Sequence, residues 1–161
     1  MTITARRVDG APVILRALRS KDRGEWEALR AQNLEWLRRW EATSPERVAT
    51  RLAFRQLVRQ SDREAAQGRL QPFVIETAGR LVGQMPLFGL AWGSLLCASA
   101  GYWVSDSAAG HGIMPLALAA ACAPPFGGLG LPRAALHIRP DTPAPPRVVA
   151  HPAFPPVGPR L

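Results

Sequence analysis

The residues best suited to chemistry lie in GYWVSDSAAGHGIMPLALAAAC, residues 101–122, where a strand-like stretch runs into two glycines around one histidine. Gly110 and Gly112 directly precede an Ala- and Leu-rich run that favours a helix. A helix N-terminus leaves backbone N–H groups without intrahelical partners, and its dipole is positive there. Glycines also let a ligand approach the main chain closely. The junction therefore predicts an anion site for phosphate or pyrophosphate, with a plain tight turn as the alternative.

The elements that must position this junction follow from the hydrophobic pattern. PVILRALR reads as a first strand, and Ser20 is the expected N-cap of a helix that places Trp26, Leu29 and Leu34 on one face. LEWLRRWEAT continues helically, and a further helix starts at Ser44-Pro45 and ends near Gly68.

The middle of the chain has β character. QPFVIET, LVGQMPLFGL and LLCASAGYWV predict three strands, with hairpin connections at Ala78-Gly79 and near Trp92-Gly93. A helix from Gly112 to Cys122 and the strand RAALHIRP follow. This order predicts an α+β fold with a mixed sheet, in which residues 1–161 form one domain.

Composition limits the class of protein. The net charge is +8, but the basic residues alternate with acids along the expected helices, which favours a solvated face over a nucleic-acid patch. Cys97 and Cys122 are far apart and lack histidine spacing, which indicates a reducing, cytoplasmic setting with neither a disulfide framework nor a metal site. The sequence has no run of about 18 apolar residues and no signal-peptide core, so we expect no membrane association.

The glycine pair and its flanks resemble the acetyl-CoA-binding segment of the GCN5-related N-acetyltransferase (GNAT) superfamily, although Ser107 stands where that motif usually has Gln or Arg. More narrowly, the chain resembles the ribosomal-protein-alanine N-acetyltransferases of the RimJ/RimL branch. NLEWLRRWEAT, FVIETAGRLVGQMPLFGL, SAGYWVSDSAAGHGIMPLAL and LGLPRAALHIRP occur in the family order over residues 12–140. The resemblance implies a GNAT-type acyl-CoA N-acyltransferase fold, a mostly antiparallel sheet flanked by helices.

It also implies an activity, the transfer of acetyl from acetyl-CoA to a protein N-terminal amine, by direct attack of the amine on the thioester and without a metal. The acceptor would be a ribosomal protein, another protein N-terminus or a small amine. The strand at Trp103 and Val104 would pair with the pantetheine arm, and the following turn would receive the pyrophosphate on its amides. The implied cofactor-binding residues are Trp103, Val104, Ala109, Gly110, His111, Gly112 and Ile113.

The same resemblance places the acceptor pocket at residues 36–41. Trp36 and Trp40 would bind the substrate, and Glu41 would hold or deprotonate the amine as the catalytic residue. Each residue has a structural alternative, since Trp at helical spacing usually belongs to a core and Glu is usually a solvated charge. Met114 and Leu116 are expected in the core.

The C-terminal part departs from the family pattern. Eleven of the sixteen prolines follow residue 120, and residues 139–161 are expected to be irregular, with the last family strands incomplete. Pro145 stands where the family has Ser, and Val149 where many relatives have Tyr to protonate the leaving thiolate. Two alternatives therefore stay open: a catalytically impaired CoA-binding relic, and a basic ribosome- or RNA-associated binder. An uncovered sheet edge would also allow a homodimer.

Overall fold

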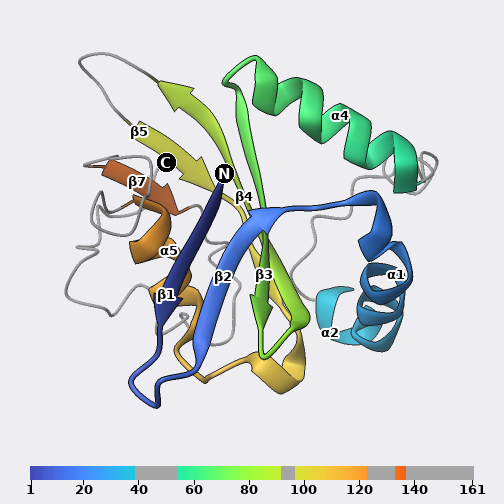
Figure 1. The fold of residues 1–161 in the computed structure, drawn as a ribbon, viewed down its shortest axis with the longest axis vertical. Helices are drawn as coiled ribbons and strands as arrows, with labels where there is room; N and C mark the ends of the chain where they lie inside the picture. Colours follow the sequence, from blue (N-terminus) through green and yellow to red (C-terminus); the bar gives the residue numbers. More distant parts are fainter. Residues whose placement is uncertain (39–53, 92–96, 123–132, 137–161) are drawn as a thin grey trace.

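The computed structural model describes residues 1–38, 54–91, 97–122 and 133–136 of the chain. This part forms a seven-stranded sheet in the order β1-β2-β3-β4-β5-β7, with β6 also paired to β4 (Figure 1). All strand pairs are antiparallel except β5 with β7, which confirms the predicted α+β fold with a mixed, mostly antiparallel sheet. The strands are β1 (Thr2–Arg6), β2 (Pro12–Ala17), β3 (Leu70–Thr77), β4 (Arg80–Ala91), β5 (Cys97–Ala100), β6 (Trp103–Val104) and β7 (Arg133–Leu136). The helices are η1 (Ser20–Asp22), α1 (Arg23–Gln32), α2 (Leu34–Arg38), α4 (Phe54–Ala66), η2 (Asp106–Ala108) and α5 (Ile113–Cys122).

Strand β1 is an element that the sequence did not lead us to expect. It pairs with β2, so that Ile3 lies opposite Leu15 and Ala5 opposite Val13, and all four side chains are buried. A five-residue alternating segment has little signal of its own. Its conformation is decided by the neighbouring strand and by the apolar layer under it.

The hairpin predicted between β3 and β4 is confirmed. Ala78 and Gly79 have φ angles of 49° and 73°, and Thr77 pairs with Arg80 across the turn. Two successive residues with positive φ are typical of the two-residue turn that matches the twist of antiparallel strands.

One predicted strand, LLCASAGYWV, is divided into β5 and β6. The pairs Leu87–Ala100 of β5 and Gln84–Trp103 of β6 are in the same register, so the break at residues 101–102 is local, while the register of β5 shifts further along, between Phe88 and Ala91. The Gly101 N–H donates to the Pro86 carbonyl at 3.2 Å. Pro86 has no N–H to return the bond, which interrupts the ladder at this point.

Helices cover both faces of the sheet (Figure 1). Helix α5 packs on one face, while α1 and α4 pack on the other. Met114 lies in the first core and Leu116 packs against it, as predicted from the sequence. The buried residues under α5 are Ile3, Ala5, Val13, Leu15, Phe73, Ile75, Met85, Leu87, Ala98, Ala100, Ala108, Ile113, Met114, Ala117, Leu118, Ala120 and Ala121. Those on the opposite face are Leu18, Phe54, Val58, Val74 and Leu81.

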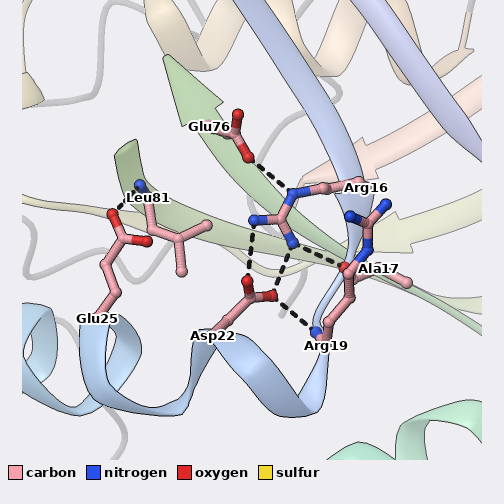
Figure 2. Close-up of polar contacts among 7 residues, drawn as sticks. All are labelled: Arg16, Ala17, Arg19, Asp22, Glu25, Glu76 and Leu81. Carbon is pink, nitrogen blue, oxygen red and sulfur yellow. Dashed lines mark hydrogen bonds and ion pairs between the residues drawn. The ribbon is translucent and has the colours of Figure 1, made fainter. Parts of the chain in front are cut away.

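A buried ion network fixes the start of α1 to the sheet (Figure 2). The Arg16 guanidinium donates to both Asp22 carboxylate oxygens at 2.7 and 3.2 Å, and its Nε donates to Glu76 at 2.7 Å. The burial of Asp22 opposes its ionisation. The hydrogen bonds from Arg16 and from the Arg19 backbone outweigh burial and hold the pKa of Asp22 below its ordinary value. On α1 itself, Glu25 accepts a hydrogen bond from the Leu81 N–H at 2.8 Å.

Two local expectations for this region are wrong. Ser20 is not the N-cap of the helix, because the 3₁₀ turn η1 comes first and Asp22 precedes α1 with its carboxylate turned back to Arg16 and Arg19. Leu34 is 46% exposed and does not share the buried face of Trp26 and Leu29, because the chain turns at Asn33 between α1 and α2.

Helix α4 ends as expected near Gly68, whose φ of 68° allows the chain to leave the helix. The expected helix start at Ser44-Pro45, the connection near Trp92-Gly93 and the C-terminal segment 139–161 lie outside the described residues. Within the described residues, no helix has the length and apolarity needed to span a membrane.

Candidate functional site

The site centres on the turn between β6 and α5, residues 105–112, here called the β6–α5 turn. Gly110 and Gly112 have φ angles of 77° and 72°, in the left-handed region that favours glycine. Both glycines and His111 are exposed, while Ile113 is buried at the start of α5. The glycine pair therefore performs the sharp change of direction that the sequence predicted between strand and helix.

The backbone donors of this turn are the candidate ligand-binding groups. Within the described residues, the N–H groups of Gly110, His111, Gly112 and Ile113 donate to no protein atom. The Leu116 N–H reaches the Gly112 carbonyl at 3.4 Å, and Pro115 in the first turn contributes no donor. Four consecutive N–H groups at a helix start are thus without a partner in the part of the chain that the structure describes, and such groups suit an anion.

Ala109 differs from the other four residues. Its N–H already donates to the Ser105 and Asp106 carbonyls at 3.0 and 3.1 Å, closing the 3₁₀ turn η2. The expectation that Ala109 offers its amide to a phosphate is therefore corrected, because the preceding turn consumes that donor.

His111 is exposed and folds back on its own turn. Its Nδ1 lies 2.9 Å from the Ala109 carbonyl, and since a carbonyl only accepts, Nδ1 is the donor. The other ring nitrogen, Nε2, is then the atom through which His111 would meet a ligand on the turn.

Strand β6 supplies the second part of the site. The Ser105 N–H donates to the Val82 carbonyl at 2.8 Å, in register with the Trp103–Gln84 pair. Because residues in an antiparallel pair alternate in the direction of their backbone groups, the N–H and C=O of Val104 point away from β4. The same alternation applies to Tyr102, a position that sequence reasoning did not include in the site.

This outer edge of β6 lies beyond the paired part of β7. Strand β7 runs parallel to β5 from Cys97–Arg133 to Ala100–Leu136, and β6 begins three residues further on. In the described part of the chain, β6 pairs only with β4. Within the described residues, the Val104 N–H is therefore the group on this edge that an extended ligand could pair with.

Gly83 allows β6 to lie close against β4. It is the cross-strand partner of Val104, and a Cβ on Gly83 would collide with the Trp103 carbonyl oxygen and lie 2.9 Å from the Val104 Cα. Only a residue without a side chain fits there. This position was also missed at the sequence level, where Gly83 was simply part of a strand.

Trp36 reaches the site through a polar contact. Its indole Nε1 donates to the Val104 carbonyl at 3.0 Å. The structure thus brings Trp36 against the strand predicted to bind the cofactor. The other residues of the expected acceptor pocket, Trp40 and Glu41, lie outside the described residues.

The Trp103 side chain lies on the side of β6 that faces α1. The Arg30 guanidinium lies 5.5 Å from the centre of the Trp103 ring and 5.3 Å from that of Trp26, distances at which a cation is attracted to an aromatic face. The Trp103 side chain thus joins β6 to α1. By the same alternation the Trp103 backbone faces Gln84 of β4, so Val104 is the β6 residue whose backbone groups face the outer edge.

The described residues contain no group of three or more His, Cys, Asp or Glu side chains that could hold a metal ion. A helix N-terminus with free amides beside an open strand edge suits a long ligand that carries phosphate at one end. This arrangement is compatible with the binding of a phosphorylated carrier.

Comparison with known proteins identifies the family. Residues 13–151 match the family described as acetyltransferase (GNAT) domain, so the chain belongs to the GNAT acetyltransferases. This membership confirms the fold and the class of enzyme, an N-acetyltransferase, that the sequence motifs implied. No curated protein sequence matches the chain.

Several solved structures are similar. Mycobacterium smegmatis RimJ, solved in complex with CoA-disulfide, is 30% identical with a TM-score of 0.77, over 94% of this chain and 74% of that one. The ribosomal-protein-S5-alanine acetyltransferase from Vibrio fischeri is 17% identical with a TM-score of 0.72, over 92% and 80% of the two chains. A Salmonella typhimurium acetyl transferase that modifies the N-terminal serine of a 50S ribosomal subunit protein is 23% identical with a TM-score of 0.66, over 86% and 77%. At these identities the last two comparisons describe the fold alone.

Proposed function

We propose that this chain uses acetyl-CoA to acetylate the N-terminal amine of a protein, with residues 1–161 acting as one catalytic domain. The observation that carries the proposal is the row of four N–H groups at residues 110–113 next to β6, a strand that pairs only with β4 within the described residues. The 30% identity to RimJ, a protein solved with a CoA derivative, supports this assignment.

The described residues fit such a cofactor. The N–H groups of Gly110, His111, Gly112 and Ile113 would hold the diphosphate, because they form a positive helix end and have no partner among the described residues. The Val104 N–H, which points away from β4, would pair with the amide-rich pantetheine arm, while the Val104 carbonyl accepts from Trp36. When bound, acetyl-CoA would supply the activated acetyl group as a thioester.

The reaction that we propose is direct transfer. The neutral amine attacks the thioester carbonyl, a C–N bond forms, and the C–S bond breaks as the tetrahedral intermediate collapses. The amine loses its proton to a base, and the departing thiolate takes up a proton. We keep Glu41 as the proposed base, and Trp36 and Trp40 as the proposed walls of the acceptor pocket.

For the acceptor, a ribosomal protein N-terminus is the first candidate, because the sequence motifs resemble the RimJ/RimL branch and Mycobacterium smegmatis RimJ is 30% identical to this chain. A small amine is the second, and a transfer assay with both acceptor classes separates them. Release of the CoA thiol should be followed with peptides that begin with Ala or Ser, with N-acetylated copies of the same peptides, and with aminoglycoside amines.

Cofactor binding is tested with a matched pair of glycine variants. Gly110 and Gly10 have φ angles of 77° and 83°, and a Cβ at either position meets no atom within 4 Å. Each Gly→Ala change should therefore cost a similar ~1–2 kcal/mol of backbone strain. Only Gly110→Ala disturbs the amide row, so its CoA dissociation constant in calorimetry should rise about tenfold.

The control variant Gly10→Ala, in the turn between β1 and β2, should keep the wild-type dissociation constant within about twofold. Equal CoA affinity of the two variants would remove the amide row from the site. Absence of any acetyl-CoA binding by the wild-type protein would overturn the proposed function itself. Binding without transfer to any amine would favour the impaired relic.

A further inference from the structure

Three consecutive residues at the end of β6 are held by hydrogen bonds from two different directions. Ser105 is bonded to β4 through its N–H and the Val82 carbonyl, at 2.8 Å. Val104 and Asp106, on either side of it, are bonded to the helices instead. Trp36 Nε1 donates to the Val104 carbonyl at 3.0 Å, and the Asp106 N–H donates to Asn33 Oδ1 at 2.9 Å. The partners lie 68 and 73 positions apart in the sequence.

Asn33 is fixed in place for this contact. It is 8% exposed and sits where α1 gives way to α2. Its Nδ2 donates to the Leu29 carbonyl at 2.9 Å, and its backbone carbonyl accepts from the Leu37 N–H at 2.8 Å. With Nδ2 engaged on its own helix, the side-chain oxygen is directed at Asp106 and has one orientation.

The β6–α5 turn lacks a cap of its own at this point. Asp106 opens η2, and η2 has no side-chain cap, since the Ser105 hydroxyl is 3.2 Å from the Ser107 hydroxyl instead. A helix start normally has its first N–H groups satisfied by a neighbouring side chain. Here Asn33 performs that task from a distant part of the chain.

The position of the free amides depends on these contacts. From Asp106 the chain makes one 3₁₀ turn, closed by the Ala108 and Ala109 N–H groups on the Ser105 carbonyl at 3.0 Å, and then reaches Gly110. The glycines that follow are conformationally permissive and do not by themselves fix the direction of their amides. An anion site needs donors held to within about half an ångström of the productive geometry.

We propose that Asn33 and Trp36 are positioning residues for the cofactor site, which fix the end of β6 and the β6–α5 turn through the Asp106 N–H and the Val104 carbonyl. This inference rests on the proposed function, and it gives Trp36 a role beyond that of a pocket wall. It also means that the α1–α2 corner, residues 29–37, is mechanically joined to the cofactor-binding turn.

The chain offers a matched control for Trp36. The Trp26 indole is also packed against neighbours, but its buried Nε1 has no hydrogen-bond partner in the described structure. Trp36→Phe and Trp26→Phe therefore make the same chemical change, and only the first removes a hydrogen bond to β6. CoA affinity, measured by calorimetry without an acceptor, should fall about tenfold in Trp36→Phe, equivalent to about 1.4 kcal/mol. It should stay within about twofold of wild type in Trp26→Phe.

Asn33 provides the second arm of the experiment. Asn33→Ala removes the acceptor for Asp106 and should weaken CoA binding about tenfold. Asn33→Asp keeps an acceptor oxygen there while losing the donor to Leu29, so it should restore CoA affinity at a reduced melting temperature. If Asn33 had a purely structural role, Asn33→Ala and Asn33→Asp would have the same CoA affinity, whether or not the acceptor oxygen is retained.

Hydrogen exchange makes the test independent of cofactor binding. The N–H groups of Ser105, Asp106, Ala108 and Ala109 all have protein partners, so peptides covering residues 104–109 should exchange slowly in the wild type. Exchange there should be about tenfold faster in Trp36→Phe and unchanged in Trp26→Phe. Unchanged exchange and unchanged CoA affinity in both Trp36→Phe and Asn33→Ala would overturn the inference and leave the proposed function standing. A wild-type protein that binds no CoA would overturn the proposed function, and exchange would still decide whether these residues hold the turn.

Discussion

The close approach of β4 and β6 leads to a prediction that links fold and site in one substitution, Gly83→Ala. Gly83 faces Val104 across the two strands. A Cβ there would lie 2.9 Å from the Val104 Cα and 3.2 Å from the Trp103 carbonyl carbon, and would collide with the Trp103 carbonyl oxygen. All three contacts are backbone atoms, which cannot rotate away as a side chain can.

The magnitude follows from this geometry. Ordinary contacts begin at 3.4 Å, so β6 must move from β4 by about 0.5 Å or more to admit the methyl group. Inserting a methyl group into a tightly packed place costs ~1–3 kcal/mol. For a domain of this size, 2 kcal/mol lowers the melting temperature by about 4–8 °C. The same displacement carries the Val104 backbone and the β6–α5 turn with it, so CoA affinity should fall as well.

Two measurements check this prediction, thermal unfolding and calorimetric titration with CoA. Gly24→Ala is the control, because Gly24 lies in α1 with no atom within 4 Å of a Cβ, so that Ala should leave stability unchanged or raise it by up to ~1 kcal/mol. The reasoning would be refuted by a Gly83→Ala protein with the melting temperature and CoA affinity of the wild type. A loss of stability with unchanged CoA affinity would separate the β4–β6 contact from the cofactor site.

Two further predictions concern the buried Asp22 and the partly buried Cys122. Since the pKa of Asp22 is lowered in the folded state, its contribution to stability is complete above its unfolded pKa of about 4 and is lost as the pH falls through the folded pKa. Asp22→Asn should therefore lower the free energy of unfolding by about 3 kcal/mol at pH 7. Urea unfolding at a series of pH values should show the difference between the variant and the wild type shrinking below pH ~4. A difference that stays constant with pH would contradict the role of the Asp22 charge. Burial raises the pKa of Cys122 to about 11, so iodoacetamide at pH ~8 should label its peptide much more slowly in the native protein than in urea; equal rates would show that the thiol is not protected.

Some features of this protein could be predicted from sequence because their causes are local. The left-handed φ angles at Ala78-Gly79, Gly110 and Gly112 follow from the steric freedom of glycine and from the turn types that join strands and helices. The start of α5 at Ile113 and the position of Met114 in the core follow from helical periodicity. These local signals were sufficient to place four free amides at a strand-to-helix junction.

Features that depend on distant partners could not be predicted in this way. Nothing within TITAR specifies β1, which exists because β2 and α5 accept its two apolar side chains. The sequence does not distinguish Arg16 from any other arginine in a strand, because its ion pairs with Asp22 and Glu76 form only in the folded chain. The sequence also does not indicate that the Ala109 N–H is used within the preceding 3₁₀ turn and is therefore not available to a phosphate.

The sequence by itself determined the family, most of the order of strands and helices, and the place of the glycine turn before α5, because glycine sterics and hydrophobic periodicity act over a few residues. Tertiary structure alone decided how that turn is held. Asn33 and Trp36 contact backbone atoms about seventy positions away. A backbone carbonyl or N–H is nearly the same for every residue type, so the residues at positions 104 and 106 do not indicate which side chains bond to them. Only the folded chain brings these backbone groups and their side-chain partners together.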